Sequence, residues 1–597
     1  MIAKVVPAVR LPYRASQIYD YNIPENLSSG ISLGCGVAIP FAGRIIAGLV
    51  MAVEEKTGDR DLKDVYGFLD GIIYPKYWTE LLPELADEFA TTMPRLVWTV
   101  LPHLMRKSVL TCCASPFVQP GGRSATAFEE KIIAANAPED LLTEFNRAVR
   151  EGQVGQTLVL VPTVPEAEAW SKEASGAAVY NSRLSDGAKY SLAAACALGE
   201  TKVVVGTKSA VFLPFRDLRS ILVLRAGASA HLNEDLDPRY DARVVARRLA
   251  QAAGAELSFV DALPPLALGK TTNSLASIDD ERLAICDLAD AGRREKAKVL
   301  LTDRVVEAAK GTLANGGRAL FLLNRRGTGS SLICADCGKA ALCPNCGVPL
   351  LSVSDETQCY ACGKTFPAPA SCDKCRGVNF KTVGTGVKAL YNYLRKIFPD
   401  ARSVLCEGGG EKADLNDFNL VIGTTAVFHA LKPRFKRFEL VCDALLGAGT
   451  GMAGIYAVEE TARILNELKL ALTPDGRLFV QTYDPAAPAL LSLTDPQAFI
   501  AKELGEREAF NYPPYGKIVK AIGAGKVQHD VFEQARTIKT ELQRSGFAEV
   551  GEPLWNAPKL FRGKYRLSIA AKAGPRQNVD NLVKYLPNGW SAEIREL

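Results

Sequence analysis

The stretch Thr157-Leu-Val-Leu-Val-Pro162 is an apolar run that ends in a proline, and three similar runs follow it along the chain. They lie at residues 202–207, 220–224 and 256–261, and stretches of helical character separate them. Short continuous apolar runs are typical of strands that are buried on both faces of a parallel sheet. We therefore expect a doubly wound α/β lobe over residues 106–300.

Three further domains are expected around this lobe. A second α/β lobe is predicted over residues 301–498, from runs at residues 318–324, 403–406, 419–424, 438–443 and 477–482. Residues 1–105 alternate short β-type runs with turn signals, which predicts a β-rich barrel or sandwich followed by helices. Residues 499–597 are entered through Asn511-Tyr-Pro-Pro-Tyr515, where two prolines prevent a helix from continuing, and predict a small α+β domain.

The composition excludes several classes of protein. The chain has 597 residues, of which 48% are hydrophobic and 23% charged, so it is too long for one core and too balanced for a disordered chain. Its net charge of +5 neither requires nor excludes a nucleic-acid partner. The N-terminal residues show no apolar signal core, and no apolar stretch approaches the ~18 residues of a membrane-spanning helix. We expect a cytoplasmic protein without a membrane partner.

Eight of the 15 cysteines form four evenly repeated Cys-x2-Cys pairs. The pairs are Cys334 and Cys337, Cys343 and Cys346, Cys359 and Cys362, and Cys372 and Cys375. Such a pair directs both thiolates at one ion, and two pairs complete a tetrahedral sulfur site. The cluster predicts two structural zinc ions with no open coordination position for catalysis, and it lies within residues 333–380. Spacing alone leaves three ways to join the pairs, and an iron–sulfur cluster or a series of redox dithiols is the less favoured alternative.

A phosphate-binding loop is not evident. Gly269-Lys270-Thr271 follows a strand, but the position that needs the first glycine of the loop holds Pro264, which has no backbone N–H to donate. The glycines between Leu446 and Gly454 resemble a dinucleotide fingerprint, but no acid-ended second strand follows at the expected interval. The four histidines lie in no metal-ligand spacing.

Ordered matches over nearly the whole chain resemble the PriA family of primosomal proteins, which restart stalled bacterial replication forks. The matching pieces are Tyr19-Asp20-Tyr21, Val37-Ala-Ile-Pro-Phe41, Leu158-Val-Leu-Val-Pro162, Val205-Gly-Thr-Lys-Ser-Ala-Val-Phe-Leu-Pro-Phe215, Pro238-Arg-Tyr-Asp-Ala-Arg243, Leu323-Asn-Arg-Arg-Gly327, the eight cysteines, Ile422-Gly-Thr424, Val480-Gln-Thr482, Tyr512-Pro-Pro514 and Arg562-Gly-Lys-Tyr-Arg566. The resemblance implies two helicase-like lobes, an N-terminal domain that binds the 3′ end of DNA, a zinc insertion and a C-terminal DNA-binding domain.

The chain departs from the family pattern where the family hydrolyses ATP. Gly121-Gly-Arg-Ser-Ala-Thr-Ala127, ahead of an expected helix, contains no Gly-Lys-Thr loop. Leu224-Arg225-Ala226-Gly227 replaces the family's Asp-Glu-Glu-His, and the Ser-Ala-Thr-Pro motif is replaced near Val260-Asp261-Ala262-Leu263. The arginine-rich motif ahead of Val480 is also absent. Phosphoryl transfer needs the phosphate cradle, the metal carboxylates and the arginines together. We therefore expect neither ATP nor magnesium as a cofactor, as in the family's actinobacterial branch.

The resemblance also assigns DNA-binding and zinc-binding residues. In the N-terminal domain the positions that match the family's 3′-end contacts are Tyr19, Asp20 and Lys63, although Ala42 replaces a family glycine. Arg562, Lys564, Tyr565 and Arg566 interleave cations with a ring in the C-terminal domain, a pattern that suits single-stranded or branched DNA. A similar stretch, residues 432–438, is the second candidate. The family precedent pairs the cysteines in a nested manner, with Cys334, Cys337, Cys372 and Cys375 at zinc 1 and Cys343, Cys346, Cys359 and Cys362 at zinc 2.

The implied function is recognition of stalled or branched forks and help in loading the replicative helicase, without helicase activity of its own. The implied partners are DNA forks and 3′ ends, other primosome proteins, the replicative helicase or its loader, and single-strand-binding protein, so the protein would be associated with the nucleoid. Two alternatives remain from sequence. In the first alternative, the chain is an active 3′→5′ helicase with an unrecognised phosphate site. In the second, it is a zinc-ribbon protein that acts on RNA or other partners without fork preference.

Overall fold

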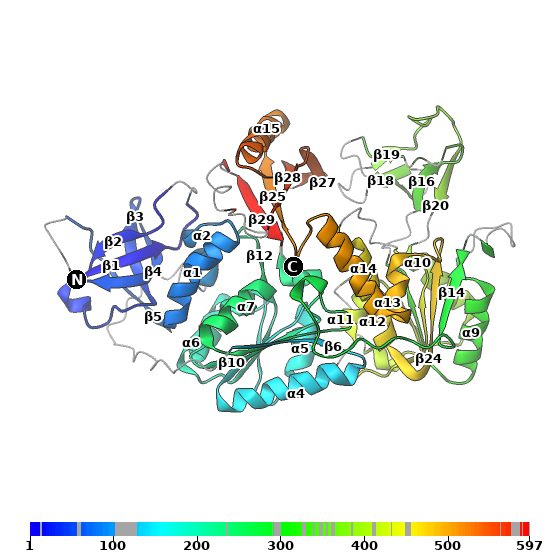
Figure 1. The fold of residues 1–597 in the computed structure, drawn as a ribbon, viewed down its shortest axis with the longest axis horizontal. Helices are drawn as coiled ribbons and strands as arrows, with labels where there is room; N and C mark the ends of the chain where they lie inside the picture. The colour runs from blue at the N-terminus through cyan, green and yellow to red at the C-terminus, as the bar shows by residue number, and fades with distance from the viewer. Residues whose placement is uncertain are drawn as a thin grey trace.

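The computed structural model describes residues 1–597 apart from residues 12–14, 56–60, 102–127, 235–236, 289, 292–299, 325–329, 338, 340, 345–349, 354–355, 360–364, 384–385, 409–413, 432, 448–454, 548, 562, 575–578, 580–585, 588 and 596–597. Figure 1 shows the N-terminal domain at one end of the molecule and the first α/β lobe beside it. The second lobe lies at the other end, with the cysteine-rich segment above it, and the C-terminal domain lies above the first lobe.

The N-terminal domain is an antiparallel sheet with strand order β2-β1-β4-β3-β5. Its strands are β1 (Ile2–Pro7), β2 (Tyr19–Asn22), β3 (Cys35–Phe41), β4 (Arg44–Glu54) and β5 (Gly67–Ile73), and helices α1 (Lys76–Glu88) and α2 (Met93–Val100) follow. One apolar face of the sheet forms a core of its own around Val5, Val37 and Val50. The other face joins the core of the first lobe through residues such as Leu49 and Trp78. The domain is therefore docked on that lobe by a shared core.

The first lobe is built on a parallel sheet with strand order β6-β13-β10-β7-β9-β8. Its strands are β6 (Glu129–Ala134), β7 (Gln156–Leu160), β8 (Ala178–Tyr180), β9 (Val203–Gly206), β10 (Leu218–Leu224) and β13 (Glu256–Asp261). Helices α4 (Pro138–Val154) and α5 (Val164–Ser171) cover one face, and α6 (Asp186–Leu198) and α7 (Ala242–Ala253) cover the other. A short hairpin, β11 (Leu232–Asn233) and β12 (Tyr240–Asp241), follows β10.

The four apolar runs predicted for this lobe are strands, but the stretch after residue 127 is not the expected helix. Glu129–Ala134 is strand β6, which pairs with β13 in parallel register. The first three residues of this strand, Glu129-Glu130-Lys131, are charged, so the sequence does not read as a strand. Because β6 is an edge strand, these side chains are able to form ion pairs: Glu129 with Lys131, Lys131 with Glu256 of β13, and Glu130 with Arg247 of α7.

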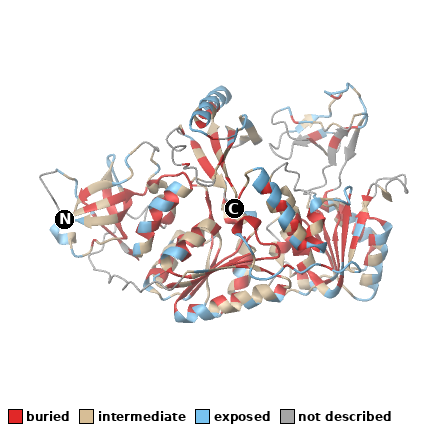
Figure 2. Ribbon diagram, viewed as in Figure 1, coloured by how far each residue is buried: buried red, intermediate tan, exposed pale blue. Residues whose placement is uncertain are grey.

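The second lobe has a parallel sheet with strand order β14-β24-β23-β15-β22-β21. Its strands are β14 (Leu283–Asp287), β15 (Ala319–Leu322), β21 (Ser403–Cys406), β22 (Leu420–Gly423), β23 (Phe438–Asp443) and β24 (Leu472–Thr482). Its helices are α9 (Asp303–Ala314), α10 (Val387–Ile397), α11 (Ala426–Ala430), α12 (Ala457–Leu470), α13 (Leu491–Thr494) and α14 (Pro496–Ala509). Figure 2 shows that both parallel sheets are buried, whereas the outer faces of the helices are exposed.

Two domain boundaries lie elsewhere than the sequence suggests. Strand β14 pairs with β24, so the second sheet starts before residue 300, where we expected the first lobe to end. Helix α14 runs past residue 498, and Phe499 belongs to the core of the second lobe. The C-terminal sheet therefore begins only at β25 (Lys517–Gly525).

The remaining elements form two small units. The cysteine-rich segment has antiparallel strand order β19-β18-β17-β16-β20, with β16 (Ser330–Cys334), β17 (Leu350–Val353), β18 (Glu356–Cys359), β19 (Thr365–Pro367) and β20 (Phe380–Val383). The C-terminal domain has strand order β26-β28-β25-β29 with β27 paired to β28, and α15 packs on it. Its elements are β25, α15 (Gln528–Arg544), β26 (Glu549–Val550), β27 (Leu554–Phe561), β28 (Lys564–Ala573) and β29 (Trp590–Arg595).

Candidate nucleic-acid interface and metal centre

Tyr19, Asp20 and Lys63 lie together at one edge of the N-terminal sheet. Tyr19 and Asp20 are on β2, the edge strand, and the Lys63 carbonyl accepts a hydrogen bond from the backbone N–H of Asn22 at 2.9 Å. The Asp20 carboxylate accepts from Lys4 Nζ at 3.3 Å, and Lys4 also lies 3.5 Å from Glu54. The edge therefore presents a half-buried ring, a carboxylate already held by a cation, and an exposed lysine.

The turn between β3 and β4 lies beside this edge. The Tyr19 ring meets the Phe41 ring edge to face, with 5.1 Å between their centroids. Ala42 has φ 45° and Gly43 has φ 76°, so both residues adopt the left-handed conformation of a tight two-residue hairpin turn. A glycine would adopt it without strain, which Ala42 cannot. The departure from the family glycine thus leaves the turn conformation possible while adding a methyl group on its exposed side.

A polar cavity that sequence reasoning missed lies between the N-terminal domain and the first lobe. It opens at the carboxyl ends of β7 and β9, where ligands commonly bind in parallel sheets. Three of its described lining residues are cations, namely Arg10, Lys189 and Lys208, and the rings of Trp98 and Tyr180 stand among them. We name this set the cationic cavity. The Val205–Phe215 motif was the signal in the sequence, since Lys208 lies within it.

The electrostatics of the cationic cavity favour an anion. Lys208 Nζ donates to the Leu232 carbonyl at 2.7 Å, which positions the side chain at the cavity. Asp237 is the one carboxylate among the described lining residues, and it is paired with Arg95 at 2.7 Å. Burial raises the pKa of Asp237, although Arg95 opposes the shift. Cations interleaved with rings are the groups that bind phosphates and stack on exposed bases.

Residues 121–127, where the sequence placed the family's phosphate loop, lie outside the described residues, and the first described strand-to-helix turn of this lobe joins β6 to α4. Pro138 is the first residue of α4 and has no N–H to donate. The Asp140 carboxylate accepts from the backbone N–H groups of Asn136 and Ala137 at 2.8 and 2.9 Å. The amides that would hold a phosphate are thus occupied by a carboxylate of the same helix. Lys270 is exposed and begins no helix.

Four cysteines from the ends of the cysteine-rich segment converge. The Sγ atoms of Cys334, Cys337, Cys372 and Cys375 all lie within 4.8 Å of one another. Cys334 and Cys375 are 3.5 Å apart, and Cys337 and Cys372 are 3.6 Å apart. Four thiolates from two Cys-x2-Cys turns match the donor set of a closed zinc site.

The backbone of the second turn suits a metal knuckle. A Cβ at Gly377 would lie 2.0 Å from an Asp336 carboxylate oxygen and 3.3 Å from Cys375 Sγ, so a larger residue there would have to displace the Asp336 side chain. Backbone N–H groups of Cys375 and Lys374 lower the pKa of the Cys372 thiol to about 6, which favours the thiolate that binds metal. Of the inner four cysteines, Cys343 is described and buried, whereas Cys346, Cys362 and the side chain of Cys359 lie outside the described residues.

The C-terminal candidates lie on β28, next to a group of rings. Lys564 is exposed, and Tyr565 and Arg566 are half-buried, while Arg562 lies outside the described residues. The Tyr565 ring packs against Trp555 with centroids 6.3 Å apart, and Trp555 stacks on Phe532 of α15 at the same separation. Rings and cations are therefore side by side on this domain.

Residues 8–102 match the family model of the PriA 3′ DNA-binding domain. The chain is 26% identical over 467 residues to the replication restart protein PriA of Synechocystis sp., a match that covers 71% of this chain and 56% of the relative. The replication restart protein PriA of Bacillus subtilis is 26% identical over 516 residues, which are 78% of this chain and 62% of that protein. The chain spans less than two thirds of the length of these curated relatives.

Solved structures that resemble this chain include the helicase MrfA bound to DNA and RecG bound to a three-way DNA junction. Their sequence identities are 11% and 12%, and each has a TM-score of 0.34. The matches cover 63% and 64% of this chain and 49% and 44% of those chains. No helix in the described part of the chain is long and apolar enough to cross a membrane.

The chain therefore combines a domain that matches a 3′ DNA-binding model, two parallel α/β lobes and a cysteine cluster that is able to hold a metal ion. The N-terminal match covers one domain, and the similarity to curated relatives extends over most of the chain. The chain is thus similar to replication restart proteins PriA.

Proposed function

We propose that this protein recognises stalled or branched DNA forks through their 3′ ends and helps load the replicative helicase, without ATPase or helicase activity of its own. The N-terminal domain that matches the 3′ DNA-binding model carries the proposal. Tyr19, Asp20 and Lys63 meet at one edge of that domain, and the cationic cavity opens where it joins the first lobe. A carboxylate facing a DNA end accepts a hydrogen bond from a terminal 3′-hydroxyl, whereas it repels a phosphate.

The lack of a motor is supported by two places in the first lobe. At the β6–α4 turn, Asp140 occupies backbone amides and Pro138 supplies none. At the end of β10, Arg225 stands where the family carries the carboxylates that hold magnesium. A cation there repels Mg²⁺, so phosphoryl transfer would lack both its cradle and its metal. These replacements resemble the ATPase-degenerate actinobacterial branch.

The cysteine-rich segment would act as a docking module held together by two structural zinc ions. Zinc supplies the cross-link that a short antiparallel segment with little apolar core needs in order to fold. We assign Cys334, Cys337, Cys372 and Cys375 to one ion and the inner four cysteines to the other. The partners would be other primosome proteins, the replicative helicase or its loader, and single-strand-binding protein, so the protein would act in the cytoplasm, at the nucleoid.

DNA-stimulated ATP hydrolysis is the assay that tests the lack of a motor. We expect no turnover above background with forked DNA, ATP and magnesium. Robust turnover that Lys270→Ala abolishes would show an active 3′→5′ helicase with an unrecognised phosphate site, and the scaffold would be wrong.

Recognition of the 3′ end is tested by fork binding at one stated salt concentration, with a fork that ends in a 3′-hydroxyl and one that ends in a 3′-phosphate. We expect Asp20→Asn to reduce the ratio of the affinities for the 3′-hydroxyl fork and the 3′-phosphate fork about fivefold to tenfold. A change of this size corresponds to the loss of about one charge-assisted hydrogen bond. Glu54→Gln is the matched control, because Glu54 pairs with the same Lys4 but lies on β4. Equal affinity of the unmodified protein for forks, duplex and single strands would favour the zinc-ribbon alternative without fork preference.

Metal analysis of the purified protein tests the nested zinc pairing. Two equivalents of zinc are expected, and a Cys334→Ser/Cys372→Ser variant should retain one of them. A single equivalent in the unmodified protein would overturn the assignment of two ions.

A further inference from the structure

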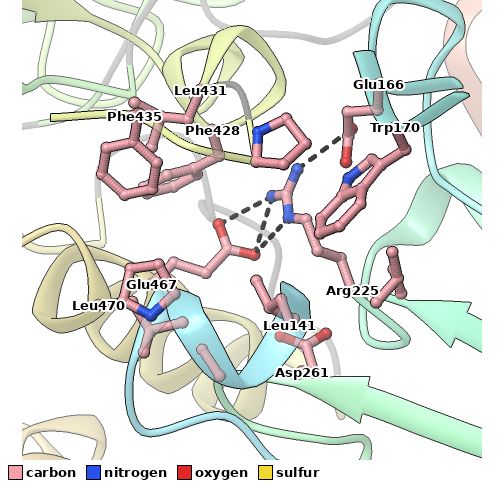
Figure 3. A pocket seen from close by; sticks show the side chains of 14 residues that line it. Leu141, Glu166, Trp170, Arg225, Asp261, Phe428, Leu431, Phe435, Glu467 and Leu470 are labelled. Carbon is pink, nitrogen blue, oxygen red and sulfur yellow. Dashed lines mark hydrogen bonds and ion pairs between the residues drawn. The ribbon is translucent and has the colours of Figure 1, made fainter. Parts of the chain in front are cut away.

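A group of buried charges lies between the two lobes, at the position where the first lobe lost its carboxylates. Figure 3 shows the Arg225 guanidinium between the Glu166 and Glu467 carboxylates. Arg225 Nη2 donates to both Glu467 oxygens, at 2.8 and 2.9 Å, and Nη1 lies 3.3 Å from Glu166 Oε1. The side chains of Arg225, Glu166 and Glu467 are only 13%, 3% and 5% exposed.

These contacts join elements of different lobes. Arg225 follows β10 and Glu166 lies on α5, both in the first lobe, whereas Glu467 lies on α12 in the second. Glu166 also lies 2.7 Å from Nδ1 of His429, on α11 of the second lobe. Arg225 has φ 49°, so the backbone turns sharply where β10 ends, before its side chain reaches the second lobe. Arg225 Nη1 also lies 2.8 Å from Nδ1 of His429, so Arg225 and Glu166 of the first lobe form one connected group with Glu467 and His429 of the second.

Each partner is held by further groups of its own lobe. Arg463, one turn before Glu467 on α12, donates to Glu467 at 2.6 Å and pairs with Glu460. Thr163 Oγ1 donates to Glu166 at 2.9 Å. Burial by itself raises the pKa of Glu166, but Arg225 and His429 outweigh it and lower that pKa to about 2. The carboxylate therefore stays charged and paired throughout the neutral range.

We propose that Arg225, Glu166, Glu467 and His429 form an interlobe clamp that holds the two lobes in one fixed arrangement. Separating the lobes would leave Arg225 without Glu467 and Glu166 without His429, and an unpaired charge that stays partly buried is strongly unfavourable. The clamp also places a guanidinium where an ATP-dependent lobe closure would need room for phosphates and metal. It goes beyond the proposed function, because the fixed lobe arrangement does not depend on any DNA preference.

Apolar side chains protect the clamp from water. The hollow around Arg225 is lined by Trp170 of the first lobe and by Phe428 and Phe435 of the second, and Arg225 lies over the Phe428 ring with 5.7 Å to its centroid. Salt screens an ion pair only weakly when the paired groups are buried in surroundings of low dielectric constant. The clamp should therefore persist at high ionic strength.

A second row of ion pairs crosses between the lobes at the rim. Arg434 Nε lies 2.8 Å from Glu173, and Arg437 pairs with Glu139. Both arginines belong to the stretch 432–438 that the sequence offered as a DNA-binding candidate. In the structure they face carboxylates of the first lobe, so they extend the line of interlobe contacts.

Hydrogen exchange of the full-length protein tests the clamp. In Arg225→Met we expect amide exchange in α5 and α11 to accelerate at least tenfold, with α14 and β25 unchanged. Arg507→Met is the matched control, because Arg507 is as deeply buried between Glu459 and Glu503, yet all three lie in the second lobe. It should accelerate α14 and leave α5 and α11 within twofold of the unmodified protein.

A double variant separates loss of the clamp from loss of folding. Arg225→Met/Glu467→Met removes both charges, while Arg463 retains its ion pair with Glu460 and Glu166 retains its contact with His429 Nδ1, so each described partner keeps one polar contact. We expect it to fold, with circular dichroism like that of the unmodified protein, and still to show the faster exchange in α5 and α11. Exchange restored to the original rate, or unchanged in Arg225→Met itself, would overturn the clamp. The ATPase and fork-binding assays read out the proposed function separately.

Discussion

Two hollows lie along the carboxyl edge of the first lobe's sheet, and they differ in the partners of the charged side chains that line them. At the ends of β10 and β13, Arg225 and Asp261 line a hollow where most charges are paired within the protein. At the ends of β7 and β9, Lys189 and Lys208 line the cationic cavity, and each donates one hydrogen bond to a backbone carbonyl. The same strand edge is therefore closed by internal ion pairs on one side and lined mainly by cations on the other.

The contrast separates two kinds of cation along one strand edge. A cation that is paired with a buried carboxylate cannot also neutralise a phosphate. Four predictions test this contrast between the two hollows, in order of decreasing effect.

Arg225→Met should lower the free energy of unfolding by about 3 to 5 kcal/mol, because Glu166 and Glu467 lose their shared partner while they remain buried. Urea unfolding at neutral pH measures the change. Arg225→Met/Glu467→Met should recover more than half of the loss. If the single variant costs less than about 1 kcal/mol, the paired charges of this hollow are not structurally important.

Asp261→Asn should stabilise the protein at pH 8 by about 3 kcal/mol, on the conversion of about 1.4 kcal/mol per pKa unit. Burial first, and then the nearby Glu467, raise the pKa of Asp261 to about 6, although Arg463 and Arg225 oppose the shift. A raised carboxyl pKa stabilises the fold below pH 4, and that contribution is lost as pH rises through 6.

The asparagine removes this titration and keeps an oxygen for the backbone N–H of Gly227, which donates to Asp261 at 2.5 Å. Thermal unfolding between pH 4 and pH 8 should therefore show a flatter stability profile for the variant. Parallel profiles for the two proteins would mean that Asp261 is not the group responsible.

Lys189→Gln/Lys208→Gln should weaken binding of forked DNA about tenfold and reduce the slope of log affinity against log salt by about 2, if each lysine contacts one phosphate. Fluorescence anisotropy over a salt series measures both quantities. Lys310→Gln/Lys396→Gln is the control, since both lysines are exposed on helices of the second lobe. Equal losses in the two double variants would show a general charge effect and not a cavity.

Arg434→Gln should have the smallest effect, about 0.5 kcal/mol or less, because its guanidinium is 67% exposed and water screens its pair with Glu173. Unfolding at low and high salt checks this, and the small effect should vanish at high salt. A larger loss of unfolding free energy that does not depend on salt would show that the Arg434–Glu173 pair stabilises the protein as a buried ion pair does.

Much of the fold could be predicted from local pattern. The central strands β7, β9 and β10 are continuous apolar runs, since both of their faces are covered by helices. Edge strands such as β6 could not be predicted, because one side of an edge strand meets water and its composition resembles that of a helix or a loop. Strand β14 looked like the end of the first lobe, because pairing across 190 or so residues leaves no local trace.

The candidate site divides in the same way. The eight cysteines and the missing phosphate loop are visible in the sequence, since spacing and proline chemistry are local properties. Spacing left three pairings open, and the structure brings Cys334, Cys337, Cys372 and Cys375 together, in agreement with the outer site of the nested pairing. The cationic cavity draws Arg10, Lys189 and Lys208 from distant segments, so no window of sequence contained it.

The sequence by itself determined the class of fold, the four cysteine pairs and the resemblance to a known family, because each depends on residue type and local order. Only the tertiary structure decided which distant charges meet. Arg225 reads as a simple substitution along the chain, and its role depends on Glu467, 242 positions away, being brought within 2.8 Å. Electrostatic contacts depend on distance and burial, and both are fixed only when the two lobes pack together.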